Sequence, residues 1–385
     1  MHGAVVIDST VGGRARGGLR LLADVSAAEL CALARTMTLK YGFLGLPQGG
    51  AKAGVVGDPE APLGERRRLL GEFARAIAPL LERREYLPGP DMGTDASDIR
   101  HALESVGVRV GAQDLGSARS GDYTAQTVVA AALVALRRRG ISTAGATAAI
   151  EGFGSVGQAV ARRLAAAGVG IVAVSTSRGA ILDRRGLDIE RLVAAASQSR
   201  SAVVERFPEP ERIAGPALLE LPVDLLLPCA RHESIHPGNA ARITARVVCA
   251  GANNPVTQAA ETALWQRGVL CLPDFVTNSG GVLGGTMEFA GIDPERIAGF
   301  VEGTFGARVD ALIARSERLR VPPREVVEPL ALARFDEVRR AADRPSPAQR
   351  LFRAGLAAHR RGWSPRHLVA RLAMRYFAAS LVQIG

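Results

Sequence analysis

The chain has 385 residues, which is too long for one ordinary hydrophobic core and predicts two domains. Its formal charge of +10 is scattered over short arginine runs and only 4% of its residues are aromatic, so nucleic-acid binding is disfavoured. No uncharged apolar run approaches the roughly 20 residues of a membrane span, and the first residues lack the pattern of a signal peptide, so we expect a soluble, cytoplasmic protein without a membrane partner.

The first predicted elements alternate strand and helix. Residues 4–7 predict a short strand, and residues 12–20, rich in glycine, predict a loop. Ser26 and Glu29 have the spacing of a capping box, which predicts a helix that ends near Lys40. After it, the abundant glycine in residues 41–56 favours extended chain and tight turns over helix.

Lysine is almost absent from this chain. Of its 48 basic residues only Lys40 and Lys52 are lysines, and both lie in this glycine-rich part of the sequence. Arginine stays protonated, whereas a lysine that is desolvated or placed beside another cation can lose its proton. The pattern therefore suggests proton-transfer chemistry at Lys52, and the alternative is two surface lysines left over by chance.

Two helices and a polar loop follow. Residues 65–82 and 124–139 predict helices, and residues 88–95 predict a loop that carries Asp91. Next come a strand over 146–150, a turn, a helix and a second strand over 170–174.

The turn between these strands carries the spacing G-x-G-x-x-G in Gly152, Gly154 and Gly157. Between a strand and a helix this spacing predicts a dinucleotide pyrophosphate at the helix N-terminus. The second strand ends in Thr176, where an acidic residue would usually bind the ribose, and Arg178 follows. The missing carboxylate gives a weak preference for NADP over NAD, with a solvent-facing Arg178 as the alternative.

Three further buried strands are predicted at 223–227, 247–249 and 269–272, and the last 45 residues are predicted to be helical. The sequence His232-Glu-Ser-Ile-His236 has the letters of a zinc motif, but Pro237 would end the helix that the motif requires, so we expect no metal site.

The four cysteines have no paired C-x-x-C spacing, which predicts buried free thiols in a reducing compartment. They are Cys31, Cys229, Cys249 and Cys271.

Taken together, these blocks resemble the glutamate, leucine, phenylalanine and valine dehydrogenase family from about Val5 to past Glu288. The carrying blocks, in chain order, are Met37–Lys40, Leu46–Lys52, Pro88–Thr94, Thr124, Gly152–Gly157, Gly251–Asn253, Pro273–Phe275 and Asn278–Val282. The resemblance implies an α/β protein of two domains around a cleft. We expect a substrate and assembly domain at 1–122, rejoined by helices at about 341–385, and a Rossmann domain at 123–340.

The same resemblance implies an NAD(P)-dependent oxidative deamination of an L-amino acid to a 2-oxo acid and ammonia, in a homo-oligomer. Lys52 and Asp91 would be catalytic. Lys40 would bind the substrate carboxylate and lower the pKa of Lys52. The remaining expected substrate contacts are Arg16, Gly17, Asn278 and Val282. The expected cofactor contacts are Thr124, Gly152, Gly154, Gly157, Thr176, Arg178 and Asn253.

The substrate is the open question at this stage. Arg16 stands where glutamate enzymes carry a lysine and could pair with a side-chain carboxylate, which favours glutamate. Gly285 stands where those enzymes carry an assisting serine. A leucine- or phenylalanine-type enzyme with an apolar pocket remains an alternative, as does a non-catalytic NADP-binding amino-acid sensor.

Overall fold

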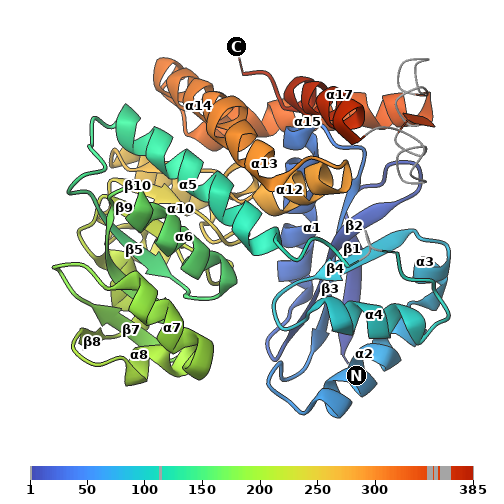
Figure 1. Ribbon diagram of the computed structural model, residues 1–385, viewed down its shortest axis with the longest axis horizontal. Helices are drawn as coiled ribbons and strands as arrows, with labels where there is room; N and C mark the ends of the chain where they lie inside the picture. The colour runs from blue at the N-terminus through green and yellow to red at the C-terminus, as the bar shows by residue number, and fades with distance from the viewer. Residues whose placement is uncertain (1, 112–114, 345–349, 351–353, 356–365, 385) are drawn as a thin grey trace. The chain divides into compact units, whose positions relative to one another are not determined.

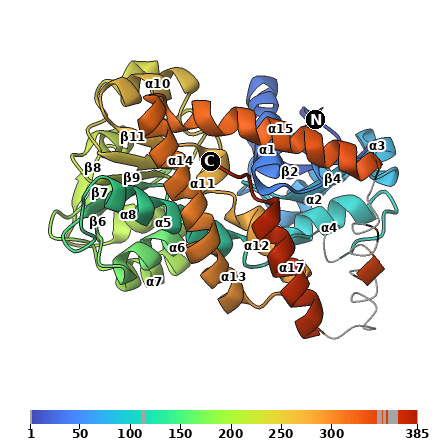
Figure 2. The same cartoon turned by 90° about the horizontal axis from the view of Figure 1, so that it is seen from above.

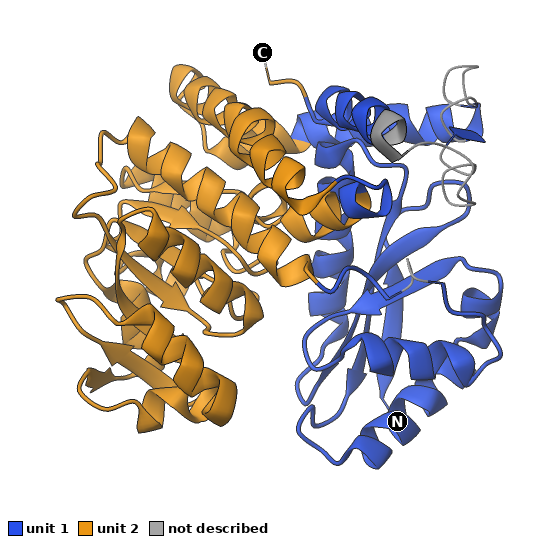
Figure 3. Ribbon diagram, in the orientation of Figure 1, with its two compact units in different colours: residues 1–118, 287–292, 329–382 blue, residues 119–286, 293–328, 383–385 orange. Residues whose placement is uncertain are grey.

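The computed structural model describes residues 2–111, 115–344, 350, 354–355 and 366–384. The chain is of the α/β class and forms two compact units, coloured separately in Figure 3. The first unit comprises residues 1–118, 287–292 and 329–382, and the second comprises residues 119–286, 293–328 and 383–385.

A four-stranded sheet in the order β1-β3-β2-β4 forms the centre of the first unit. Strand β1 is antiparallel to β3, and the other neighbours are parallel. The elements of the first 106 residues are β1 (Gly3–Ile7), β2 (Ala15–Leu22), α1 (Ala27–Leu44), β3 (Gly49–Val56), α2 (Leu63–Ala76), α3 (Ala78–Glu82), β4 (Tyr86–Pro90) and α4 (Ala96–Glu104). Helix α17 (Arg366–Ser380) belongs to the same unit.

The two faces of this sheet are covered differently. One face carries the apolar core, in which Leu19 and Val55 pack against Phe73 of α2 and Ile99 of α4, two helices that lie side by side in Figure 1. The other face is rich in glycine and lies under α1. A Cβ at Gly50 would stand 2.3 Å from Thr38 Oγ1, so only glycine lets the α1 backbone approach this closely.

The second unit is built on a seven-stranded sheet in the order β11-β10-β9-β5-β6-β7-β8. The five strands from β11 to β6 are parallel, and β7 and β8 add an antiparallel edge. The strands are β5 (Thr147–Glu151), β6 (Gly170–Thr176), β7 (Gly179–Leu182), β8 (Glu211–Ile213), β9 (Leu225–Pro228), β10 (Val247–Cys249) and β11 (Leu270–Leu272).

Helices cover both faces of this sheet, as in a Rossmann fold. Figure 2 shows α10 beside β11. The helices are α5 (Ser120–Arg138), α6 (Ser155–Ala166), α7 (Ile189–Ser199), α8 (Val203–Arg206), α9 (Pro237–Ala240), α10 (Gln258–Gln266), α11 (Asp274–Thr277), α12 (Gly280–Phe289), α13 (Pro294–Phe300), α14 (Gly306–Leu319) and α15 (Pro323–Asp343). Two of them, α12 and α15, continue into the first unit.

Three expectations from the sequence are corrected in the first unit. The stretch expected to be a loop at 12–20 is a turn only at Gly12 and Gly13 and then enters strand β2, where Gly17 and Gly18 allow close contact with Ala51, Asp91 and Lys52. The helix expected at 65–82 is divided at Ile77, since Pro79 has no N–H with which to continue it. Cys31 is exposed instead of buried.

The remaining expectations have mixed outcomes. The five apolar strands of the second unit are present, but the β7–β8 edge was not anticipated. Residues 232–236 form no helix, as the following Pro237 led us to expect, and His236 caps the four-residue α9. Part of the helical region expected over the last 45 residues lies outside the described residues. Within the described residues, no helix combines the length and the apolar character that crossing a membrane requires.

Candidate active site

Both lysines are buried in the first unit. Lys40 in α1 is 5% exposed and Lys52 in β3 is 2% exposed, so neither is a leftover surface residue. Lys52 lies between Gly50 and Gly54 on the glycine-rich face of the sheet, which explains how a long side chain fits beneath α1.

Asp91, the residue that follows β4, forms the centre of a charged cluster. Its Oδ2 lies 2.7 Å from Lys52 Nζ and accepts a hydrogen bond of 3.0 Å from Arg20 Nε. Arg20 is in β2, between β3 and β4, so three neighbouring strands each bring one member of the cluster to the same face. Both contacts of the cluster are made by Oδ2, and no hydrogen bond from a described residue reaches Oδ1 of Asp91.

The pKa values of Lys52 and Asp91 are both lowered in this cluster. Burial lowers the pKa of Lys52 and the charge of Arg20 lowers it further, while Asp91 opposes both. Burial alone would raise the pKa of Asp91, but the charges and hydrogen bonds of Lys52 and Arg20 outweigh it and lower the pKa to about 2. Asp91 is therefore a carboxylate at neutral pH, and Lys52 is a cation that loses its proton more easily than an exposed lysine.

A further acidic residue holds Arg20 in place. Glu29, near the start of α1, accepts a short hydrogen bond from Arg20 Nη1, and both side chains are buried. Sequence reasoning used Glu29 only as a capping residue and did not select Arg20. In a chain with 46 arginines nothing distinguishes a buried one by type alone, although its position two residues after Gly17-Gly18 was a usable signal.

The paired glycines of β2 are required by this packing. A Cβ at Gly17 would stand 1.6 Å from Ala51 O, and one at Gly18 would stand 2.6 Å from Asp91 Cβ and 3.2 Å from Lys52 Nζ. Arg16, half-buried in the same strand, is on the same face as Gly18 by strand alternation. Its charge lowers the pKa of Tyr41 and Tyr86, although burial raises both on balance.

The glycine-rich turn of the second unit follows β5, at the point between β5 and β9 where strand order reverses. Gly152 has φ +91°, and a Cβ there would stand 2.8 Å from Ala230 Cβ. A Cβ at Gly157 would stand 2.0 Å from Gly152 O, whereas one at Gly154 would meet nothing within 4 Å.

These three environments fit a dinucleotide pyrophosphate. Gly154 is the N-cap of α6 and provides no side-chain hydrogen bond, so the first backbone N–H groups of α6 have no side-chain cap. The open space beside Gly154 lets an anion approach those groups and the positive end of the helix dipole.

The end of β6 lacks an acidic side chain. Thr176 Oγ1 donates to Ser201 O and accepts from the backbone N–H of Arg178. The Arg178 guanidinium lies 3.6 Å from Glu205, and both side chains are about half exposed.

Four other expected site residues also belong to the second unit, and hydrogen bonds join two of them. Asn278 Nδ2 donates to Ala252 O at 2.7 Å and to Asn253 Oδ1 at 3.0 Å. Thr124 is buried in α5, where a Cβ at Gly281 would stand 2.8 Å from its hydroxyl, and Val282 is the next residue of α12. The strand-end loop with Asn253, the segment at 278–282 and the first turns of α5 are thereby brought together.

A buried ion network supports this loop and was not found from the sequence. Asp274 Oδ2 accepts from the backbone N–H of Asn254 at 2.8 Å, while Asp274 Oδ1 accepts from Arg324 at 2.8 Å. Arg324 also binds both carboxylate oxygens of Glu261. The network fixes the loop after β10, and its partners are too far apart in sequence for spacing to reveal them. No group of metal ligands occurs among His, Cys, Asp and Glu of the described ranges.

Comparisons with known proteins agree with this arrangement. Residues 1–106 match the Glu/Leu/Phe/Val dehydrogenase dimerisation domain, and residues 116–294 match the Glutamate/Leucine/Phenylalanine/Valine dehydrogenase domain. A glutamate dehydrogenase of Thermotoga maritima is 38% identical over 283 residues, which are 70% of this chain and 68% of that protein. The chain belongs to the Glu/Leu/Phe/Val dehydrogenase family.

Other members of the family give the same result. An NAD-specific glutamate dehydrogenase of Staphylococcus aureus is 36% identical over 282 residues, covering 70% of this chain and 67% of that protein. The hetero-hexameric glutamate dehydrogenase of Thermus thermophilus in its Leu-bound form has a TM-score of 0.76 at 29% identity, over 87% of this chain and 84% of that one. The chain thus spans about two thirds of the length of the curated relatives it matches.

Membership of the Glu/Leu/Phe/Val dehydrogenase family makes the chain an amino acid dehydrogenase, an oxidoreductase that uses a nicotinamide cofactor. The predicted family, fold class and reaction class are confirmed, and the glutamate dehydrogenase-like interpretation is favoured over the alternatives.

Proposed function

We propose that the chain catalyses the reversible oxidative deamination of L-glutamate to 2-oxoglutarate and ammonia. The observation that carries the proposal is the buried cluster of Lys52, Asp91 and Arg20. A cation with a lowered pKa, in contact with a carboxylate held ionised, supplies both a base and a second proton-transfer group.

The proposed steps follow from the charge of each group. Lys40 holds the substrate α-carboxylate. A nicotinamide cofactor held by the turn of Gly152, Gly154 and Gly157 would supply the acceptor for the hydride of the substrate Cα. Lys52 in its neutral form, which its lowered pKa makes accessible, takes a proton from the water that attacks the resulting iminium carbon. The ammonium formed in this way stabilises the developing carbonyl oxygen. Asp91 Oδ1 exchanges a proton with the amine, which leaves as ammonia.

Arg16 is the proposed determinant of the acidic substrate. Gly17 beside it is proposed as a contact through its backbone, because a Cβ there would stand 1.6 Å from Ala51 O. A guanidinium can bind a side-chain carboxylate through two parallel hydrogen bonds. Its place on the same face as Gly18, which packs against Asp91 and Lys52, supports a role near the reacting groups.

The substrate proposal is tested by replacing Arg16 with leucine. Steady-state rates with ammonium would be measured for 2-oxoglutarate and for 4-methyl-2-oxopentanoate, in wild type, Arg16→Leu and the exposed control Arg14→Leu. We expect Arg16→Leu alone to lose about 10- to 100-fold in kcat/KM for 2-oxoglutarate, because one charged hydrogen-bonding partner contributes about 1.5–3 kcal/mol. Unchanged 2-oxoglutarate turnover, or a wild type that prefers the aliphatic acid, would assign the chain to the apolar-pocket branch.

The proposed contacts to the pyrophosphate and to the nicotinamide half of the cofactor are backbone and neutral groups. The turn of Gly152, Gly154 and Gly157 would hold the pyrophosphate, while Thr124 and Asn253 would contact the nicotinamide half. We further propose Asn278 and Val282 as neighbours of the substrate, on the support of the hydrogen bonds that tie Asn278 to Asn253.

The preference for NADP rests on Arg178, beside Thr176. An ion pair of 3.6 Å at half exposure stabilises by only about 0–1 kcal/mol, so a 2′-phosphate can replace Glu205 as its partner. We expect Arg178→Ala to raise KM for NADPH severalfold and to leave KM for NADH unchanged, measured by the decay of reduced-cofactor absorbance. An equal effect on both cofactors would refute the assignment, and the NAD-specific relative from Staphylococcus aureus is the natural comparison.

We also propose that the chain works in the cytoplasm as a homo-oligomer. The match of residues 1–106 to a dimerisation domain supports self-association, and the hetero-hexameric state of the Thermus thermophilus glutamate dehydrogenase supports assembly into an oligomer. Light scattering of the purified chain at micromolar concentration should give a mass above the 40.4 kDa of one chain, and a monomer would contradict this.

A further inference from the structure

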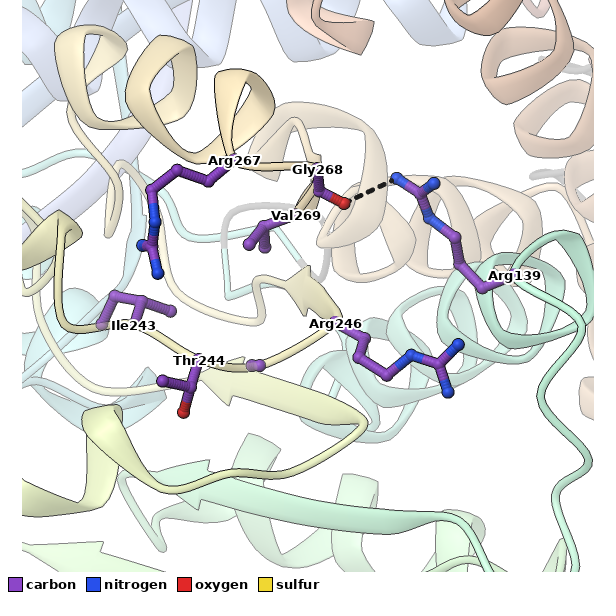
Figure 4. A pocket seen from close by; sticks show the side chains of 8 residues that line it. Arg139, Ile243, Thr244, Arg246, Arg267, Gly268 and Val269 are labelled. Atoms are coloured by element: carbon purple, nitrogen blue, oxygen red, sulfur yellow. Dashed lines mark hydrogen bonds between the residues drawn. The ribbon is translucent and has the colours of Figure 1, made fainter.

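The second unit has a pocket at the edge of its sheet where the parallel strands begin. The pocket has a volume of about 360 Å³, and Figure 4 shows three arginines around it. Arg139 ends α5, Arg246 precedes β10 and Arg267 ends α10. Apolar lining comes from Ile243, Ala245 and Val269.

The positive charge of this pocket is poorly compensated. Arg246 lies 3.5 Å from Asp224, at 56% and 21% side-chain exposure, which is a weak surface pair. In the part of the chain that the structure describes, Arg139 and Arg267 form no ion pair. Each donates instead to one backbone carbonyl, Arg139 to Gly268 O at 3.2 Å and Arg267 to Ala240 O at 2.6 Å.

One donor of Arg139 is buried without an acceptor. Arg139 Nε is inaccessible to solvent and has no hydrogen-bond partner. Leaving a buried charged donor unsatisfied costs free energy, so such a group needs an explanation. This Nε does not face the pocket, and the Nε atoms of Arg66, Arg67 and Arg308 are buried without a partner in the same way, so the proposal does not depend on it. The favourable position of Arg139 and Arg267 at helix C-termini explains their charge, but it does not explain the presence of Arg246, which belongs to no helix.

We propose that this pocket binds a small phosphorylated anion through its phosphate group. Each guanidinium is anchored by a single contact, so its remaining N–H groups stay available in the planar fork that matches phosphate oxygens. The volume is in the range of small-molecule sites, and the apolar lining could receive the rest of the ligand.

The pocket is distinct from the dinucleotide turn. The turn follows the carboxyl end of β5, whereas the pocket precedes the amino ends of β10 and β11. Each of these two strands has three residues and is therefore about 10 Å long. A ligand in the pocket would thus sit one strand length from the loop with Asn253, independently of the activity proposed above.

The test uses calorimetric titration of the full chain at fixed ionic strength, with NAD or NADP saturating the dinucleotide turn. Pyrophosphate and adenosine monophosphate are titrated into wild type, Arg246→Met, Arg267→Met and the control Arg185→Met, which removes an equal charge from an exposed pair with Asp183. Thermal unfolding confirms that each variant is folded.

We expect wild type to bind at one site and the two pocket variants to bind at least 10-fold more weakly, while Arg185→Met binds like wild type. Equal affinity for both ligands would show that the pocket recognises phosphate alone, and a preference for the nucleotide would show that the apolar lining contributes. The proposal is overturned if wild type shows no saturable binding, if the pocket variants bind as wild type does, or if Arg185→Met weakens binding as much as they do.

Discussion

The two sheets of this enzyme carry their candidate sites in opposite ways. On the first sheet, charged side chains of Lys52, Asp91 and Arg20 are buried together, and the pKa values of Lys52 and Asp91 are lowered. On the second sheet, the turn from Gly152 to Gly157 exposes backbone N–H groups instead of charged side chains. Its glycines matter because a Cβ would collide with a neighbour at Gly152 and Gly157 and would fill open space at Gly154. Chemical identity of side chains is therefore critical in the first unit, whereas backbone geometry is critical in the second.

The largest expected effect is on kcat, and it distinguishes the role of Lys52 from that of Lys40. Lys52→Arg keeps the positive charge but removes the ability to lose a proton, so we expect kcat to fall by about 10³-fold, as for loss of a general base. Lys40→Arg keeps the permanent cation that the proposed carboxylate contact needs, so we expect kcat to change less than about 10-fold while KM rises. Steady-state kinetics of both variants decides, and equal losses in kcat would contradict the separate roles.

Arg20→Met tests how strongly the first sheet depends on paired charge. It leaves Glu29 buried without its main cation, which should lower the free energy of unfolding in urea by about 3 kcal/mol. The double variant Arg20→Met, Glu29→Met should recover most of this loss, because both charges are then absent. A single variant as stable as wild type would show that the cluster is not a buried network.

Glu151, in the second sheet, is a buried acid with a shifted pKa, and replacing it tests the comparison between the sheets. Burial raises the pKa of Glu151 to about 7, although the Ser234 hydroxyl and the charge of Arg231 oppose the shift. The folded state then keeps a proton that the unfolded chain loses near pH 4.5, so Glu151 destabilises increasingly from pH 4.5 to 7 and fully above pH 7.

We therefore expect Glu151→Gln to raise the free energy of unfolding by about 2 kcal/mol at pH 8 and by less at pH 5, measured in urea. The exposed Glu211→Gln serves as control and should show no such dependence. A gain of equal size at both pH values would contradict the raised pKa.

The smallest expected effects compare two glycines of one turn. Gly157→Ala places a Cβ 2.0 Å from Gly152 O and should cost about 1–3 kcal/mol of stability. Gly154→Ala meets open space and should leave the melting temperature unchanged, yet weaken cofactor binding several-fold by occupying the approach to α6. A lower melting temperature of Gly154→Ala, or a cofactor affinity equal to that of wild type, would show that the open space at Gly154 does not serve the approach of the cofactor to the backbone N–H groups of α6.

The sequence was most informative about the second sheet. Strands β5, β6, β9, β10 and β11 were predicted within two residues at their starts, because fully buried parallel strands are continuous apolar runs between glycine and proline. The β7–β8 edge escaped prediction because β8 is largely exposed and therefore has no continuous apolar run.

In the first unit the sequence was less informative, for physical reasons. Gly17 and Gly18 suggested a loop, although they lie in β2 where a side chain would collide with Ala51 or Asp91. The rarity of lysine did identify two buried residues, but Arg20 owes its importance to burial and to a long-range partner, as Arg324 does in the second unit. The sequence indicated only an approximate return to the first unit, at about residue 341. The structure passes back briefly at Met287–Ile292 and then at Pro329 inside α15.

The most direct test of the account is whether reduced cofactor is oxidised by this protein in the presence of ammonium and 2-oxoglutarate. Absorbance of NADPH and of NADH would be followed with the purified wild type, alongside 4-methyl-2-oxopentanoate and phenylpyruvate as competing substrates. The account predicts that 2-oxoglutarate is turned over fastest. Absence of turnover with every 2-oxo acid, by a folded protein that binds cofactor, would contradict it.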